Sequence, residues 1–209
     1  RKNIWDLEKK IINIFLGSKE IINHLDFASG TGRIAKFLEK NVRKQYLLDS
    51  SEKMLEFSKT ILDSDDTTFI HGDFSNISLD KKFDLITAFR FFPNAEPFLR
   101  RNAMEFISKN LSENGILIFN NHKNFWSIPF FIERLTFRSN GFGMTHKEIK
   151  QLVKNCNLKI YKYKSVGLMT NKEKSLIIPW TIISKLENIF LKIFSNHLLG
   201  YNVVYVVGK

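Results

Sequence analysis

Residues 24–35 read His24-Leu25-Asp26-Phe27-Ala28-Ser29-Gly30-Thr31-Gly32-Arg33-Ile34-Ala35, and they predict a buried strand, a tight turn and the start of a helix. Gly30 and Gly32 allow backbone conformations, and a close approach of a ligand, that a side chain would block. The open N–H groups of the helix start lie beside this turn. Ligands of open α/β sheets bind at the carboxyl ends of the strands, so a nucleotide-like ligand is expected here.

Strands and helices alternate outward from this turn. Strands are expected over residues 21–28, 45–49, 67–71, 83–89, 116–120, 158–165 and 203–207. Helices are expected over residues 4–16, 33–40, 50–62, 95–111 and 145–156, the last capped by Thr145. The strand segments are mostly apolar runs, as in parallel strands that are buried on both faces. The alternation therefore predicts a parallel sheet with helices on both faces.

The composition is that of an ordinary globular domain. The chain has 209 residues, of which 44% are apolar and 25% are charged, and this excludes a disordered or collagen-like chain. No run of about 18 apolar residues predicts a transmembrane helix. No signal-peptide pattern is present, and because the chain starts at Arg1 rather than at Met, a segment is expected before it. The single cysteine, Cys156, cannot form an internal disulfide, which fits a reducing compartment, so a cytoplasmic protein is expected.

The chain is strongly basic. Its 32 Lys and Arg residues against 21 Asp and Glu residues give a net charge of +11 at pH 7. Such a charge favours anionic partners, namely nucleic acid, phosphorylated substrates or an acidic membrane surface. The basic residues are spread along the chain, so a specific nucleic-acid role is not the favoured interpretation, although it stays open.

Two cofactor interpretations compete for the glycine turn. The pattern Gly30-x-Gly32-x-x-Ala35, with Asp49 at the end of the next strand, satisfies the dinucleotide fingerprint of NAD-dependent oxidoreductases. The acidic residue Asp26, four positions before Gly30, favours the other interpretation. Residues 26–32, Asp-Phe-Ala-Ser-Gly-Thr-Gly, resemble motif I of the class I S-adenosylmethionine-dependent methyltransferases, in domains of the type 11/25 kind.

The resemblance extends over residues 20–120 in the right order. Residues 47–55 resemble the second motif, residues 71–74 the third, residues 83–88 the fourth strand, and residues 111–117 the turn into the fifth strand. It implies a Rossmann-like, doubly wound seven-stranded mixed sheet, mostly parallel with an antiparallel last strand. Residues 1–209 would form a single domain, with residues 121–144 and 171–200 on the acceptor side. Ala28 stands where the family most often has a glycine, and this should tighten the turn.

The resemblance also implies which residues hold S-adenosylmethionine. Asp26 would orient the turn or meet the ammonium group, Asp49 would accept from both ribose hydroxyls, and Asp73 would take the adenine amino group. Each acid could instead cap a helix or a turn, but three acids that end successive strands favour a shared site. Asp49→Ala is expected to weaken cofactor binding with little loss of fold. The expected cofactor residues are Asp26, Ala28, Ser29, Gly30, Gly32, Asp49, Ser50, Met54, Gly72, Asp73, Phe74, Ala88 and Phe89.

The acceptor is expected to be a small or medium-sized molecule that is methylated on oxygen or nitrogen. A weakly acidic nucleophile needs a base, and His122, just past the fifth expected strand, is the candidate because imidazole titrates near neutral pH. The alternative is a hydrogen-bonded loop histidine. Arg90 is a candidate for pairing with a carboxylate or phosphate of the acceptor, or else forms a salt bridge within the fold.

Several acceptor classes are disfavoured by the residues after the fourth and fifth strands. Residues 89–94 lack the Asn/Asp-Pro-Pro-aromatic motif of adenine and glutamine N-methyltransferases, and no cysteine follows either strand for methylation at carbon. Asn120-Asn121 stands where catechol-type enzymes have a metal-binding Asp-Asn pair, so no metal is expected. Methyltransferases of RNA or of lipid-linked substrates remain alternatives, the latter because residues 180–199 form an amphipathic pattern that could rest on a membrane.

Overall fold

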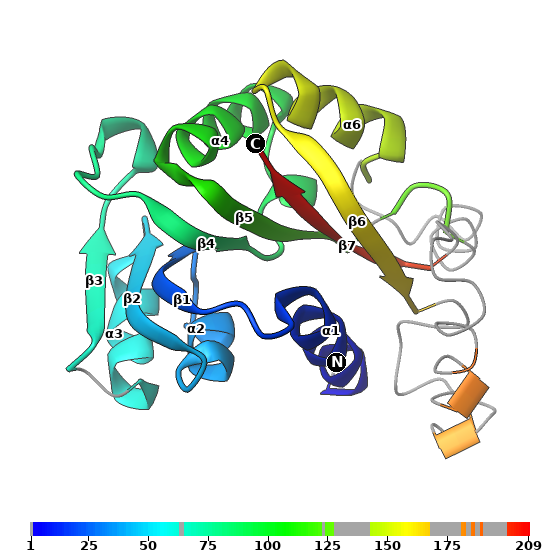
Figure 1. Ribbon diagram of the computed structural model, residues 1–209, viewed down its shortest axis with the longest axis horizontal. Coiled ribbons are helices and arrows are strands. Elements are labelled where there is room, and N and C mark those ends of the chain that lie inside the picture. The colour runs from blue at the N-terminus through cyan, green and yellow to red at the C-terminus, as the bar shows by residue number, and fades with distance from the viewer. Residues whose placement is uncertain are drawn as a thin grey trace.

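The structure is a computed structural model that describes residues 2–62, 65–122, 124–127, 143–167 and 200–209, together with residues 181, 182, 185, 186 and 189. Seven strands form one sheet (Figure 1): β1 (Ile21–Phe27), β2 (Val42–Asp49), β3 (Thr67–His71), β4 (Phe83–Ala88), β5 (Leu111–Asn121), β6 (Lys159–Val166) and β7 (Asn202–Gly208). The helices are α1 (Lys2–Leu16), α2 (Arg33–Leu38), α3 (Glu52–Ile61), α4 (Pro97–Asn110) and α6 (His146–Asn155), with short 3₁₀ turns η1 (Phe74–Asn76) and η2 (Phe92–Asn94).

The strand order confirms the expected fold class. The order is β3-β2-β1-β4-β5-β7-β6; the pairs among β3, β2, β1, β4 and β5 are parallel, and β7 runs antiparallel to both β5 and β6. From β1 the chain proceeds outward through β2 to β3 and then returns to place β4 on the other side of β1. This reversal puts a topological switch point at the carboxyl ends of β1 and β4, where open α/β sheets bind ligands.

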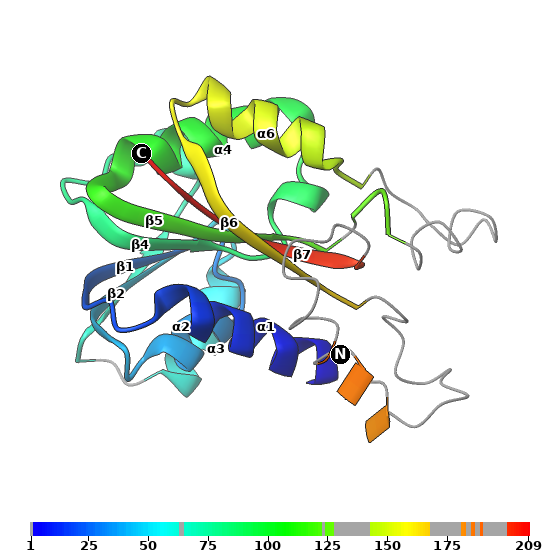
Figure 2. The same ribbon diagram turned by 45° about the vertical axis from the view of Figure 1, so that its right-hand side comes forward.

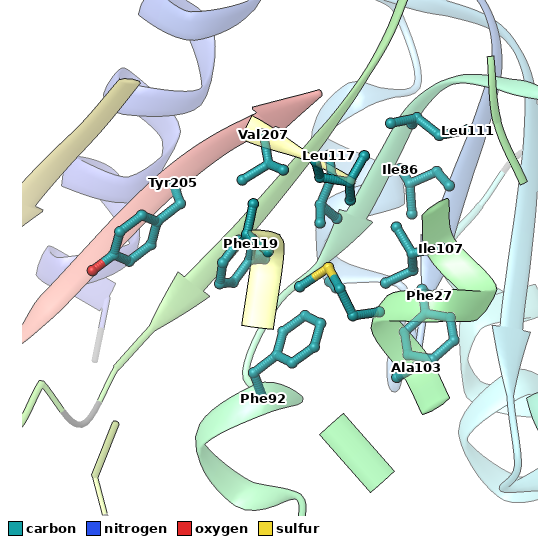
Figure 3. Close-up of a cluster of buried hydrophobic side chains, with 14 of the residues drawn as sticks. Phe27, Ile86, Phe92, Ala103, Ile107, Leu111, Leu117, Phe119, Tyr205 and Val207 are labelled. Atoms are coloured by element: carbon teal, nitrogen blue, oxygen red, sulfur yellow. The ribbon is translucent and has the colours of Figure 1, made fainter. Parts of the chain in front are cut away.

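Helices cover both faces of the sheet. Figure 2 shows α1, α2 and α3 on one face and α4 and α6 on the other. Along β5 the side chains alternate between the two cores: Leu117 and Phe119 join the core under α4 and α6, whereas Ile118 joins the core under α1 and α2. Figure 3 shows the first of these cores, in which Phe119 stacks on Tyr205 with ring centroids 5.2 Å apart.

A local signal explains the start of α6, whereas the start of α3 is held differently. The Thr145 side chain accepts a hydrogen bond from the Glu148 N–H while the Glu148 carboxylate accepts one from the Thr145 N–H, so α6 begins with the expected cap. Ser51 takes the cap position of α3, but its side chain makes no capping hydrogen bond. Its N–H donates instead to the Asp49 carboxylate at 2.9 Å.

The expected start of β5 was wrong by several residues. Asn114-Gly115 predicted a turn before a strand at residues 116–120, but β5 already begins at Leu111. The pairing with β4 shifts from Phe83 opposite Leu111 to Leu85 opposite Ile116, so the extra residues are absorbed as an irregularity within the strand. A Cβ on Gly115 would lie 2.6 Å from the Phe83 carbonyl oxygen, so glycine is needed for this close approach rather than to end a loop.

The two segments assigned to the acceptor side lie largely outside the described residues. Of residues 121–144 the structure describes 121, 122, 124–127, 143 and 144, and of residues 171–200 it describes 181, 182, 185, 186, 189 and 200. Their covering role stays a prediction, as does the single-domain organisation. Among the described helices, none combines the length and the apolar character that crossing a membrane requires.

Candidate active site

The turn between β1 and α2 is left-handed at both of its glycines. Gly30 has a φ of 55° and Gly32 a φ of 67°, a region in which side-chain-bearing residues are strained. A Cβ atom on Gly30 would meet no described atom within 4 Å, so the space beside this residue is open. A Cβ atom on Gly32 would lie 3.0 Å from the Ser58 hydroxyl oxygen, so Gly32 is also needed for the close approach of α3.

Ala28 has the same left-handed backbone, with a φ of 51°. This conformation costs a residue that has a Cβ atom about 1–2 kcal/mol. Strained backbone of this kind concentrates where chains approach ligands. Substitution of the more usual glycine by alanine therefore leaves a strained turn at this position.

Two carboxylates hold the turn from opposite sides. Asp26, on β1, accepts hydrogen bonds from the Thr87 hydroxyl at 2.8 Å and from the Ala35 N–H at 3.3 Å, so it orients the start of α2. Asp49, at the end of β2, accepts from the Gly30 N–H at 2.7 Å with one oxygen and from the Ser51 N–H with the other. Each carboxylate oxygen has a second acceptor direction. Asp49 and the glycine turn are therefore joined directly, as a shared ligand site requires.

Two adjoining cavities open at this edge of the sheet. The larger has a volume of about 1030 Å³ and the smaller about 140 Å³, and both are lined by Ala28, Phe91 and Leu99. Five further expected cofactor residues line the larger cavity: Asp26, Ser29, Gly30, Met54 and Phe89. Another five line the smaller cavity: Asp49, Ser50, Gly72, Asp73 and Phe74. The structure thus gathers residues from β1 and β2, and residues that directly follow β3 and β4, around the two cavities.

The remaining expected cofactor residues lie differently. Ala88 is fully buried in the core under α4, because its position on β4 faces that core, and it lines neither cavity. Gly32 lines neither cavity and packs against Ser58. Asp73, which lines the smaller cavity, is exposed, and its carboxylate accepts from the Ser75 N–H at 2.9 Å and from the Ser75 hydroxyl at 2.8 Å. These hydrogen bonds lower the pKa of Asp73 and correspond to the turn-capping alternative.

The larger cavity contains a polar atom suited to a ligand. The Ser29 hydroxyl is buried at its wall and has no hydrogen-bond partner among the residues that the structure describes. Leaving such a group unsatisfied costs about 1–3 kcal/mol, so a polar ligand at the turn would relieve this cost. The Ser29 hydroxyl, the open space beside Gly30 and the acceptor oxygens of Asp49 together suit a nucleoside-containing cofactor.

Residues 25–115 match the methyltransferase domain family. These residues are therefore a methyltransferase domain. This match decides between the two cofactor interpretations of the glycine turn in favour of the methyl donor. A search of the curated proteins finds no match to the sequence.

Solved structures share the fold at low sequence identity. A methyltransferase from Clostridium acetobutylicum is 16% identical, with a TM-score of 0.66 over 95% of this chain and 89% of the other. An N-methyltransferase from Bradyrhizobium japonicum is 12% identical, with a TM-score of 0.66 over 99% and 96%. The magnesium protoporphyrin IX methyltransferase of Synechocystis, with bound S-adenosylhomocysteine, is 10% identical, with a TM-score of 0.68 over 96% and 81%.

Arg90 lines the larger cavity of this methyltransferase, directly after β4. Its φ of 65° is left-handed, and its N–H donates to the Asn120 side-chain oxygen at 2.7 Å. Its Nε atom is buried and has no hydrogen-bond partner within the described part of the chain. The alternative of a salt bridge within the fold is not observed for Arg90 among these residues.

A buried polar network that the sequence did not indicate lies behind Arg90. Glu8 of α1 is only 1% exposed and accepts from the side-chain amides of Asn120 at 3.0 Å and Asn202 at 2.6 Å. Its second oxygen lies 3.5 Å from the Arg33 guanidinium, which stacks over the Trp5 ring at 4.1 Å. Burial lowers the pKa of Arg33; Glu8 opposes this shift, whereas the charge of Arg90 adds to it. The network fixes α1 and two arginines at the rim of the cavity.

His122 lies apart from this arrangement. It follows the end of β5, is half-buried, and lines neither cavity. The residue of β5 that supports the cavity wall is Asn120, through the Arg90 N–H. No histidine lines either cavity in the described part of the chain, so a role for His122 as general base stays a prediction. Within the described ranges, no group of three or more His, Cys, Asp or Glu side chains could hold a metal ion.

A chain of buried polar side chains lies beneath the cofactor turn. The His24 Nε2 atom lies 2.8 Å from the Thr87 hydroxyl, which also contacts Asp26, and His24 Nδ1 lies 3.2 Å from the Gln45 side-chain oxygen. Burial lowers the pKa of His24 to about 4 and raises the pKa of Asp26 to about 7. Asp26 therefore changes charge near neutral pH, whereas His24 is neutral there.

Proposed function

We propose that this methyltransferase methylates an oxygen or nitrogen atom of a small or medium-sized acceptor that binds in the larger cavity. The volume of about 1030 Å³ carries the proposal. Pockets that enclose one small molecule measure about 300–1,000 Å³, so the hollow has room for the methionine part of the donor and a second molecule beside it.

The walls of this cavity suit the reaction. When bound, S-adenosylmethionine supplies an electrophilic methyl group on a sulfonium. Trp5, Phe89, Phe91 and Leu99 form an apolar wall that would exclude water from the transferred methyl group. Holding two reactants in line can lower a barrier by about 7–11 kcal/mol, and an acceptor that is already nucleophilic then needs only positioning. We propose a cytoplasmic location as well, in keeping with the lone Cys156 thiol.

Calorimetric titration and a turnover assay test this proposal. The protein should bind S-adenosylhomocysteine and not NADH, and it should release S-adenosylhomocysteine from the donor when it is given hydroxyl- or amine-bearing small molecules. Asp80→Ala, an exposed carboxylate outside both cavities, should keep these properties and serves as the matched control for Asp49→Ala. Turnover with structured RNA but with no small acceptor would contradict the proposed acceptor class.

A second candidate is peripheral membrane contact. Ile182, Leu186 and Ile189 are 49%, 45% and 52% exposed, and Lys185 lies among them. Their spacing is typical of one helix face, and a basic amphipathic helix binds anionic lipid surfaces. Co-sedimentation with vesicles containing phosphatidylserine, lost in Ile182→Asp/Ile189→Asp and weakened in Lys185→Gln at low salt, would support a lipid-linked acceptor. Absence of binding by the wild type would contradict it.

A further inference from the structure

We propose that Arg90 and Arg33 form an anion subsite in the wall of the larger cavity and that the acceptor carries a carboxylate or phosphate group on an apolar body. The inference rests on the proposed function, because it takes this cavity as the place where the acceptor binds. It narrows the acceptor from any small nucleophile to an amphipathic oxyanion.

Arg90 is fixed in the wall of the larger cavity through its backbone. Its backbone is held in a left-handed conformation, which is strained for arginine, by the hydrogen bond from its N–H to Asn120. Asn120 is itself held by Glu8 and Asn202. These hydrogen bonds fix the backbone of Arg90, while its buried Nε atom has no hydrogen-bond partner among the described residues. A planar guanidinium held this way presents donors that match a carboxylate or phosphate.

The wall of the larger cavity carries two positively charged side chains, Arg33 and Arg90. Of the two cationic side chains, Arg33 pairs with the Glu8 carboxylate, whereas Arg90 has no ion-pair partner among the described residues. One oxygen of Glu8 already accepts from two amides. The two guanidinium groups are close enough for the charge of Arg90 to act on the pKa of Arg33. Like charges held together in a partly buried site disfavour each other, and a bound oxyanion would relieve this repulsion.

Asp26 does not remove the excess positive charge. It is the carboxyl group that lines the same cavity, but its oxygens accept from Thr87 and Ala35, and burial raises its pKa to about 7. At neutral pH its negative charge is only partly present. Two arginines are therefore balanced only by Glu8, which pairs with Arg33, and by a partly protonated Asp26, so the wall keeps a net positive charge.

The apolar side chains of the cavity indicate what the uncharged part of the acceptor is. Trp5, Ile34, Phe89, Phe91 and Leu99 line the same cavity as the two arginines. An inorganic anion would leave these side chains without contact, whereas an aryl or alkyl body would cover them. The combination of a cationic end and an apolar wall fits an acceptor such as an aromatic or aliphatic acid, or its phosphate counterpart.

A carboxylate could also come from the methionine part of the donor, and the experiment separates the two sources. Binding of S-adenosylhomocysteine and of 5′-methylthioadenosine, which lacks the amino-acid part, is measured by calorimetry for the wild type, Arg90→Gln, Arg33→Gln and the exposed control Arg101→Gln. Phenylacetate, phenyl phosphate and the neutral phenylacetamide are then titrated into each protein saturated with S-adenosylhomocysteine. Thermal unfolding checks that each variant is folded.

The expected result is a preference of the wild type for both anions over phenylacetamide, which falls about tenfold or more in Arg90→Gln and stays in Arg101→Gln. Binding of S-adenosylhomocysteine should change less than threefold in Arg90→Gln. Equal binding of anions and amide by the wild type, or no binding of the anions at millimolar concentration, would overturn the proposal. So would a loss of S-adenosylhomocysteine binding with unchanged 5′-methylthioadenosine binding in Arg90→Gln, because Arg90 would then bind the donor. Failure of the wild type to bind S-adenosylhomocysteine at all would instead refute the proposed function.

Discussion

Substitution of Asp49 by alanine should weaken both the fold and cofactor binding. Its carboxylate accepts from the Gly30 N–H at 2.7 Å and from the Ser51 N–H at 2.9 Å. Each hydrogen bond contributes about 1 kcal/mol net, so Asp49→Ala should lower the free energy of unfolding by about 2 kcal/mol. For a chain of this length that corresponds to a fall in Tm of about 4–8 °C. The expectation from sequence, that the fold would be spared, did not include these two contacts.

The effect on binding is separate and larger. If the remaining acceptor directions of Asp49 hold the two ribose hydroxyls, their loss removes two charge-assisted hydrogen bonds of about 1.5 kcal/mol or more each. S-Adenosylhomocysteine affinity should then fall by a factor of about 100 or more. Urea unfolding gives the stability, and calorimetry well below the Tm of the variant gives the affinity.

Asp49→Asn and Asp80→Ala complete the set of variants. Asp49→Asn keeps one acceptor oxygen, so it should lose less stability than Asp49→Ala. Asp80→Ala removes an exposed carboxylate and should change neither quantity. Unchanged stability in Asp49→Ala would show that the hydrogen bonds to the turn contribute nothing. Unchanged affinity would refute the ribose assignment while leaving the fold argument intact.

Three further perturbations have distinct expected outcomes. In the folded state the pKa is about 7 for Asp26 and about 4 for His24, and the two groups change the stability in opposite directions with pH. Asp26 contributes stability that is lost as pH rises from about 4 to 7. His24 contributes stability that is lost as pH falls from about 6.5 to 4. Asp26→Asn keeps His24, so urea unfolding should show that its stability rises as pH rises from about 4 to 6.5. His24→Gln keeps Asp26, so its stability should fall as pH rises from about 4 to 7. Each change should be at most about 1.4 kcal/mol per pH unit. Gly32→Ala should cost more stability than Gly30→Ala, because only the first places a Cβ 3.0 Å from a neighbouring hydroxyl, whereas Gly30→Ala should cost more S-adenosylhomocysteine affinity. Phe119→Ala should lower the free energy of unfolding by about 3–5 kcal/mol, because it empties a fully buried site between the rings of Phe92 and Tyr205.

Each of these has a result that would contradict it. Equal pH slopes in the two single variants would mean that the buried chain of polar groups does not titrate as described. A larger loss of affinity in Gly32→Ala than in Gly30→Ala would mean that the ligand lies on the other side of the turn. Phe57→Ala, at a side chain that is 52% exposed, is the control for Phe119→Ala and should change stability by less than about 0.5 kcal/mol.

The cofactor turn was predictable because its signals are local. Strand, glycine turn and helix start are adjacent in the chain, and β3 has the predicted bounds of residues 67–71. The acids at 26, 49 and 73 each follow or end a parallel strand, so the carboxyl edge of the sheet brings them together without any knowledge of side-chain packing. Even so, the sequence could not show that Asp49 would bind the Gly30 N–H, because that contact depends on how the turn folds back toward β2.

The wall of the larger cavity was not predictable in the same way. Arg90 was singled out by its place after the fourth strand, but Glu8 and Trp5 were not, because α1 carries no motif that points to a site. Arg33 stands within the glycine-turn stretch, but nothing local shows that its side chain lines the cavity. The contact between Glu8 and Asn202 joins residues that are 194 positions apart. His122, chosen because a histidine follows the fifth strand, lines neither cavity.

The sequence alone determined the order of helices and strands along the chain and the glycine turn, since periodicity and turn chemistry depend on neighbouring residues. It also carried the resemblance to S-adenosylmethionine-dependent methyltransferases. The shape and charge of the larger cavity were decided only by the tertiary structure. They depend on which face of the sheet α1 covers and on the insertion of β7 between β5 and β6, which together place Glu8, Asn120 and Asn202 in one buried network. Such contacts are set by the packing of distant elements, and no local pattern of residues specifies them.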